Sequence, residues 1–121
     1  MSDRHIHQAT AATNYAVGGS LERQGGDAPC WVPTLIFYAA MHVLDARLAD
    51  YNLHMKSQGD RHAQCAVYST DSTGPASYRK LKILSEAWRY KGDIPTSNEI
   101  SQAWRWAEAM ANAIGEPWPP R

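Results

Sequence analysis

The stretch from Trp31 to Arg61 limits the possible folds more than any other part of the chain. Its first half is apolar with a helical period, yet Tyr38, His42 and Asp45 interrupt it at spacings of four and three residues. These side chains rise along one helical face, where His42 can hydrogen-bond Asp45. An unpaired buried polar group costs roughly 2 to 7 kcal/mol, so each needs a partner. We interpret the three as a structural polar network that fixes helix register, with a functional site as the alternative.

Size and charge narrow the function classes. The chain has 121 residues, enough for one domain. Its 12 basic and 12 acidic side chains cancel, so binding to nucleic acid or anionic lipid would need a local patch. Two cysteines, Cys30 and Cys65, and no signal peptide predict reduced thiols and a cytoplasmic protein. The apolar run 31–44 is shorter than the roughly 20 residues that span a bilayer, so we expect no membrane association.

Helical periods and cap signals predict an all-α fold. Residues 1–8 show no period, so we expect a flexible lead-in, followed by one helical-bundle domain over 9–121 with a Pro-rich tail at 115–121. The expected helices are 9–23, a central helix at 31–51, 60–68, 75–91 and a last helix from a capping box at Thr96 and Glu99 to Ile114. Short connections such as 92–95 favour antiparallel neighbours, and we expect Trp118 to pack back on the bundle.

The pattern W-x6-YAAMH-x2-DARLA-x4-H-x6-R, followed by Y-x2-L-x3-S-x2-WRY, resembles the HEPN-like family of small helical bundles. The matching positions are Trp31, Tyr38, Ala39, Ala40, His42, Ala46, Leu48, Ala49, His54, Arg61, Tyr78, Leu81, Ser85, Arg89 and Tyr90. The resemblance implies an antiparallel up-and-down bundle of four to five helices that often dimerises. Similar proteins occur in toxin-antitoxin, antiviral and CRISPR-linked systems beside a partner encoded nearby. Active members cut RNA without a metal, and others serve as binding modules.

The family's ribonuclease signature, an Arg followed by a His, has one candidate here. Arg47 is separated from His54 by the six residues LADYNL. The resemblance implies that His54 would deprotonate a ribose 2′-hydroxyl and that Arg47 would stabilise the developing phosphorane charge. Leu48 occupies a position that is usually polar in the family, which counts against activity. The alternative is structural: Arg47 is solvated, and His54 lies favourably at the helix's carbonyl end.

Two basic groups are candidates for binding RNA or a partner protein. The first surrounds the loop after the central helix and comprises His54, Lys56, Arg61 and His62. The second lies on one face of the expected fourth helix and comprises Arg79, Lys82 and Arg89, with Glu86 among them. The first group suits a phosphate, with a solvated surface as the alternative. The second could contact a phosphate backbone, pair with acids of a partner, or face water.

Trp106 falls off the apolar stripe of its helix, which makes it a candidate for a dimer contact or a surface for another protein. In the alternative interpretation the Trp118 tail covers it.

His62 and Cys65 lie three residues apart, and His5 and His7 lie two apart, but neither pair completes the four ligands of a structural zinc site, so we expect no metal and no cofactor. We therefore predict a catalytically degenerate HEPN-like module that binds a partner protein or RNA in a prokaryotic defence or toxin-antitoxin system. The alternative is a metal-independent endoribonuclease that uses Arg47 and His54.

Overall fold

The computed structural model describes residues 3–120. Over that range the chain contains five α-helices and one short 3-10 helix, and no strand. The elements are α1 (Asp3–Gln24), η1 (Ala28–Trp31), α2 (Val32–Ala49), α3 (Gln58–Tyr68), α4 (Thr73–Lys91) and α5 (Ser97–Ala113). The all-α prediction is confirmed. Residues 1 and 2 of the expected lead-in and Arg121 of the expected tail lie outside the described residues.

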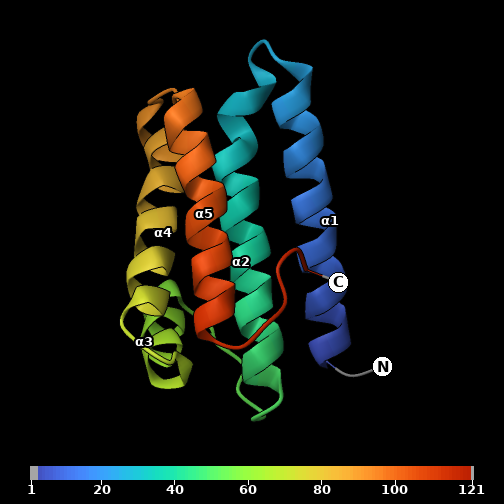
Figure 1. Ribbon diagram of the computed structural model, residues 1–121, viewed down its shortest axis with the longest axis vertical. Coiled ribbons are helices and arrows are strands. Elements are labelled where there is room, and N and C mark those ends of the chain that lie inside the picture. Colours follow the sequence, from blue (N-terminus) through green and yellow to red (C-terminus); the bar gives the residue numbers. More distant parts are fainter. Residues whose placement is uncertain (1–2, 121) are drawn as a thin grey trace.

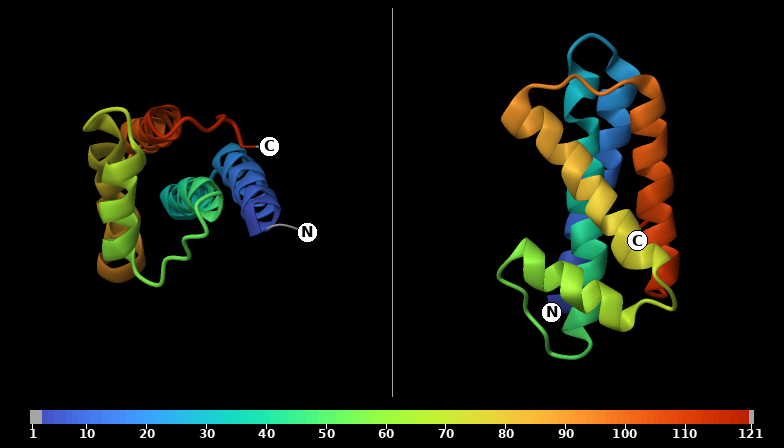
Figure 2. Two further views of the ribbon diagram at one scale, coloured as in Figure 1. Left: turned by 90° about the horizontal axis from the view of Figure 1, so that it is seen from below. Right: turned by 90° about the vertical axis from the view of Figure 1, so that its left-hand side faces the viewer.

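Four long helices lie side by side, and the short α3 lies beside the lower part of α4 (Figure 1). Short connections join α1 to α2 and α4 to α5 at one end of the molecule, while the longer 50–57 connection leads to α3 at the other end (Figure 1). Seen from the side, α4 crosses the other helices obliquely (Figure 2). Helix α2 lies in the middle and packs against α1, α3, α4 and α5.

This central position explains why α2 is apolar on nearly all sides. Ile36, Phe37, Leu44 and Leu48 are all fully buried in one core with residues from the other long helices. A helix surrounded by other helices buries most of its circumference rather than one stripe. The ends of the expected stripe, Trp31 and Tyr51, are exposed instead.

Helix α1 begins at Asp3 rather than at Ala9. Its first turn is held by tertiary contacts that periodicity does not reveal. The Arg4 guanidinium donates through Nη1 to Asp50 Oδ2 at 2.6 Å and through Nη2 to Glu116 Oε2 at 2.8 Å. Helix α1 also continues unbroken through Gly18, where a Cβ atom would lie 3.4 Å from the Trp104 ring. The missing side chain leaves room for the Trp104 ring and for Leu35 of α2, whose Cβ lies 3.5 Å from the same position.

Helix α5 begins as predicted, because Thr96 Oγ1 accepts from Glu99 N and Glu99 Oε1 accepts from Thr96 N. The chain then returns across the bundle to α1 (Figure 1). There Trp118 is half-buried, with its ring edge-on to Tyr15 at a centroid distance of 5.4 Å. The expected packing of Trp118 on the bundle is confirmed.

None of the helices in the described part of the chain is long and apolar enough to cross a membrane. Cys30 and Cys65 are both buried and free.

Candidate functional site

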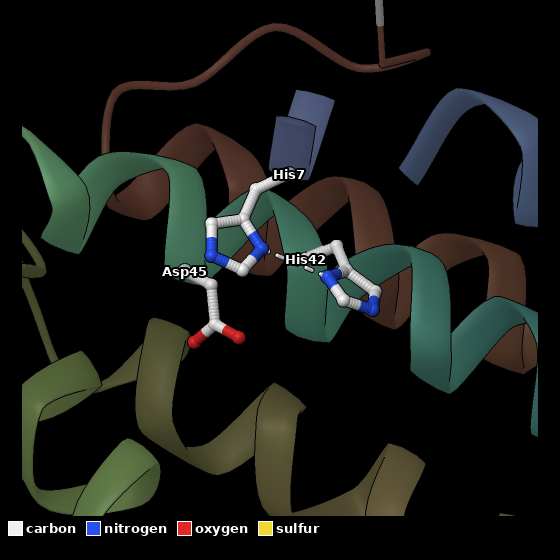
Figure 3. Close-up of side chains that lie close together, drawn as sticks. All are labelled: His7, His42 and Asp45. Atoms are coloured by element: carbon white, nitrogen blue, oxygen red, sulfur yellow. Dashed lines mark hydrogen bonds between the residues drawn. The ribbon is translucent and has the colours of Figure 1, made fainter. Parts of the chain in front are cut away.

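A polar cluster joins α1, α2 and α3 near one end of the bundle. It contains His7 from α1, His42 and Asp45 from α2, and Arg61 from α3. The Nδ1 atoms of the two histidines lie 3.0 Å apart, and their rings stack with centroids 5.3 Å apart (Figure 3). Two imidazole nitrogens at this distance form a hydrogen bond when one of them carries a proton and the other does not. One histidine therefore donates its Nδ1–H and the other accepts it.

Asp45 is only 6% exposed, and its carboxylate is bound by Arg61. Arg61 Nε lies 3.0 Å from Asp45 Oδ1, and Arg61 Nη2 lies 3.2 Å from Oδ2. Such two-point guanidinium binding is the stronger kind of charge-assisted hydrogen bond. The expected partner of His42 was Asp45, but the structure gives His42 the ring of His7 and gives Asp45 the guanidinium of Arg61.

The charge of His42 is controlled by its surroundings. Burial lowers the pKa of His42, and the nearby Asp45 carboxylate opposes this effect only in part. Electrostatic interactions with His7 and with the Arg61 guanidinium lower it further. His42 is therefore a neutral imidazole near neutral pH, with a nitrogen lone pair available to a proton or a metal ion.

Tyr38, the third member of the expected network, faces a different helix. Its hydroxyl accepts from Arg89 Nη1 of α4 at 2.7 Å. The Arg89 guanidinium lies over the rings of Phe37, Tyr38 and Tyr90 at 5.9, 5.4 and 5.3 Å. The three polar groups of α2 thus bind three neighbouring helices separately rather than one another.

Two adjoining hollows run along α3 and α4 on the side of the molecule that carries most of the predicted basic residues. One, of about 260 Å³, is lined by Gln58, Gly59, His62, Tyr78, Arg79 and Lys82. The other, of about 380 Å³, is lined by Phe37, Tyr38, Gln58, Lys82, Glu86, Arg89 and Tyr90. Gln58 and Lys82 belong to both, so we treat the two hollows as one groove, the α3–α4 groove.

The groove unites four of the residues predicted to bind RNA or a partner, namely His62, Arg79, Lys82 and Arg89. Its charge is basic but moderated, because Lys82 Nζ pairs with Glu86 Oε1 at 2.9 Å. Tyr90 is 76% exposed beside Arg89, so one aromatic face is open to a ligand. The groove therefore offers cationic side chains and an exposed ring in one place.

The other predicted binding residues lie elsewhere. Arg61 is engaged with Asp45, Lys56 is exposed on the α2–α3 connection, and Trp106 is half-buried on α5 with Lys80 Nζ 5.8 Å from its ring. The ring contact of Trp118 is with Tyr15, so the structure does not support the interpretation in which the tail covers Trp106.

Arg47 and His54, the candidate catalytic pair, have different partners. The Arg47 guanidinium lies 5.7 Å from the centre of the Tyr51 ring, and its Nε is buried without a hydrogen-bond partner. His54 is exposed, and its Nε2 lies 3.5 Å from Asp3 Oδ2. Nothing in these contacts brings the imidazole to the guanidinium.

Sequence reasoning missed three residues of these sites: His7, Gln58 and Tyr78. His7 was assigned to the lead-in, and its partner His42 lies 35 positions away. Tyr78 is fully buried, and burial raises its pKa, so its hydroxyl stays protonated and donates to Gln58 Oε1. From the sequence, Tyr78 was named only as a position of the family pattern and His7 only beside His5 in the search for zinc ligands.

Comparison of the chain with protein-family models, with curated proteins and with solved structures finds no match.

Proposed function

We propose that this chain is a HEPN-like module, an antiparallel up-and-down helical bundle without catalytic activity, that binds single-stranded RNA in the α3–α4 groove. The observation that carries the proposal is the groove itself, in which Arg79, Lys82 and Arg89 lie near the exposed ring of Tyr90. Cationic side chains attract phosphates, and aromatic rings stack on unpaired bases. The sequence resemblance supplies the family assignment.

The charges support short-range rather than long-range attraction. The protein has no net charge, and the groove places three cationic side chains against the single carboxylate of Glu86. RNA binding should therefore be moderate in affinity and sensitive to salt. An open groove with an exposed ring suits a flexible single strand better than a stiff duplex.

The resemblance extends the proposal to a biological setting. In that setting the protein is cytoplasmic, acts as a homodimer in a prokaryotic defence or toxin-antitoxin system, and works with a protein encoded nearby. Trp106 and the exposed Lys56 are the residues left for contacts with a second copy or a protein partner, because neither lines the α3–α4 groove.

Fluorescence anisotropy with a labelled single-stranded RNA, in buffer containing EDTA, tests the proposal. Arg79 is exposed on α4, so Arg79→Glu should leave the fold intact while it replaces attraction to a phosphate with repulsion. We expect its affinity to fall roughly tenfold or more. Arg105→Glu, the same charge reversal on α5 outside the groove, is the matched control and should bind nearly as well as the wild type. A wild-type protein without RNA affinity, or equal losses in both variants, would refute the proposal.

The competing proposal is a metal-independent endoribonuclease that uses Arg47 and His54. The observation in its favour is the exposed imidazole of His54, which a substrate can reach and which follows Arg47 at the family's spacing. Its test is incubation of the protein with total RNA and a chelator, beside His54→Ala. Absent cleavage, or cleavage that persists in the variant, rules out this site.

A further inference from the structure

The cluster at the junction of α1 and α2 has a composition that the RNA-binding proposal does not use. His7, His42 and Asp45 each offer one ligand atom, and these three atoms all lie within 4.8 Å of one another. No other group of this kind is present in residues 3–120. We propose that these three side chains bind a divalent transition-metal ion, with Zn²⁺ as the reference ion.

The distances are compatible with a zinc site after small side-chain movements. Zinc binds imidazole nitrogen at about 2.0 to 2.1 Å and carboxylate oxygen at about 2.0 to 2.2 Å, so tetrahedral ligand atoms lie roughly 3.3 Å apart. The separations within the cluster are at most 4.8 Å, so each pair needs to contract by at most about 1.5 Å. Rotation of the two histidine side chains toward Asp45 can cover that distance while Arg61 keeps the carboxylate in place.

The ligand types indicate which ions the cluster prefers. Two imidazoles with one carboxylate suit Zn²⁺, Co²⁺ and Ni²⁺ rather than Ca²⁺ or Mg²⁺, which prefer oxygen ligands. Three protein ligands leave one tetrahedral position for water or another ligand. A metal in this position would replace the single hydrogen bond between His7 and His42 with bonds to a common ion.

Arg61 fits the site as an orienting residue. It binds the Asp45 carboxylate through Nε and Nη2 at 3.0 and 3.2 Å, which holds that side chain in a fixed direction. A carboxylate has about four lone-pair positions on its two oxygens, so binding by a guanidinium leaves room for a metal bond. Hydrogen-bonded carboxylate ligands are the common arrangement around protein-bound metals. The positive charge of Arg61 would lower the affinity of these ligands for a metal cation but would not abolish binding.

Metal binding would clamp the N-terminal helix to the centre of the bundle, since His7 belongs to α1 and the other two ligands belong to α2. An ion that binds only the folded protein raises its melting temperature. At a free ion concentration about 100 times the Kd, a rise on the order of 10 °C is expected for a domain of this size.

Two probes test the proposal on the whole chain after removal of metal with EDTA and dialysis. Co²⁺ should produce the visible absorption of a nitrogen- and oxygen-bound tetrahedral ion at one equivalent, and Zn²⁺ should abolish that band by competition. Zn²⁺ should also raise the melting temperature. His7→Ala and the near-isosteric His42→Gln should lose both the band and the thermal shift.

His5→Ala is the matched control, because it removes a histidine two residues from His7 on the same helix but outside the cluster. It should keep both responses. Circular dichroism of each variant confirms that the loss of binding occurs in folded protein. If wild-type protein gives neither response, or if folded His7→Ala and His42→Gln respond as the wild type does, the metal proposal is overturned.

Discussion

Replacement of Arg61 by Met should destabilise the protein more than any change at its exposed surface. The substitution leaves the Asp45 carboxylate, which is 6% exposed, without its partner. Removal of one member of a buried ion pair costs about 3 to 5 kcal/mol, because the remaining charge stays desolvated. The Arg61 side chain is itself 15% exposed, so water can reach part of the site, and we expect the lower end, about 3 kcal/mol.

Replacement of Asp45 should cost less stability than replacement of Arg61. In Asp45→Asn the guanidinium of Arg61 keeps access to solvent and to Met55 O, 3.5 Å from Nη2, so the cost should be smaller, about 1 to 2 kcal/mol. In the double variant no unpaired buried charge remains. Its loss should therefore be smaller than the sum of the single losses by at least about 1 kcal/mol.

Urea unfolding in EDTA, followed by circular dichroism, measures these differences. With an m-value of about 2 kcal/mol/M, the midpoint of Arg61→Met should fall by roughly 1.5 M. A loss below about 1 kcal/mol would show that the Asp45 carboxylate is not desolvated and would refute this reasoning.

Two further predictions concern packing and pH. Gly74→Ala should destabilise the protein by about 1 to 3 kcal/mol in urea unfolding, because the new Cβ would lie 2.9 Å from Ser69 Cβ and 3.1 Å from Ala113 Cβ. Gly59→Ala should be tolerated, since the nearest neighbour of its new Cβ is 3.9 Å away. Equal losses of stability in the two variants would contradict the packing argument. In metal-free buffer, the free energy of unfolding should decrease as the pH falls below about 6.5, because burial lowers the pKa of His42 in the folded protein and the unfolded chain therefore binds a proton at this residue first. His42→Gln should flatten this part of the pH profile. An unchanged slope in the variant would contradict the prediction.

Local signals in the sequence predicted the ends of several helices well. The capping box at Thr96 and Glu99 is formed as expected, and Gly92 ends α4 in a left-handed conformation with φ of 70°. These features depend on residues within one turn of each other, so short spacings are sufficient to find them. The start of α1 was missed because it depends on Arg4 binding Asp50 and Glu116, which are 46 and 112 positions away.

In the candidate sites, too, the features that depend on local spacing were predicted and those that depend on contacts between helices were not. The spacing of Tyr38, His42 and Asp45 correctly identified side chains that need partners, but the partners come from α4, α1 and α3. Helical spacing favours neighbours within a helix, whereas a central helix directs its polar groups toward whichever helices surround it. The basic stripe of α4 was visible in the sequence, while the groove it lines requires the position of α3.

The salt dependence of RNA binding tests the central claim, that the α3–α4 groove binds a phosphate backbone, most directly. Each phosphate contact with a single strand contributes about 0.7 to the slope of log K against log salt concentration. With Arg79, Lys82 and Arg89 engaged, we predict a slope near −2 for the wild type and a slope less steep by about 0.7 for Arg79→Ala. A wild-type slope near zero, or identical slopes for the two proteins, would contradict the account.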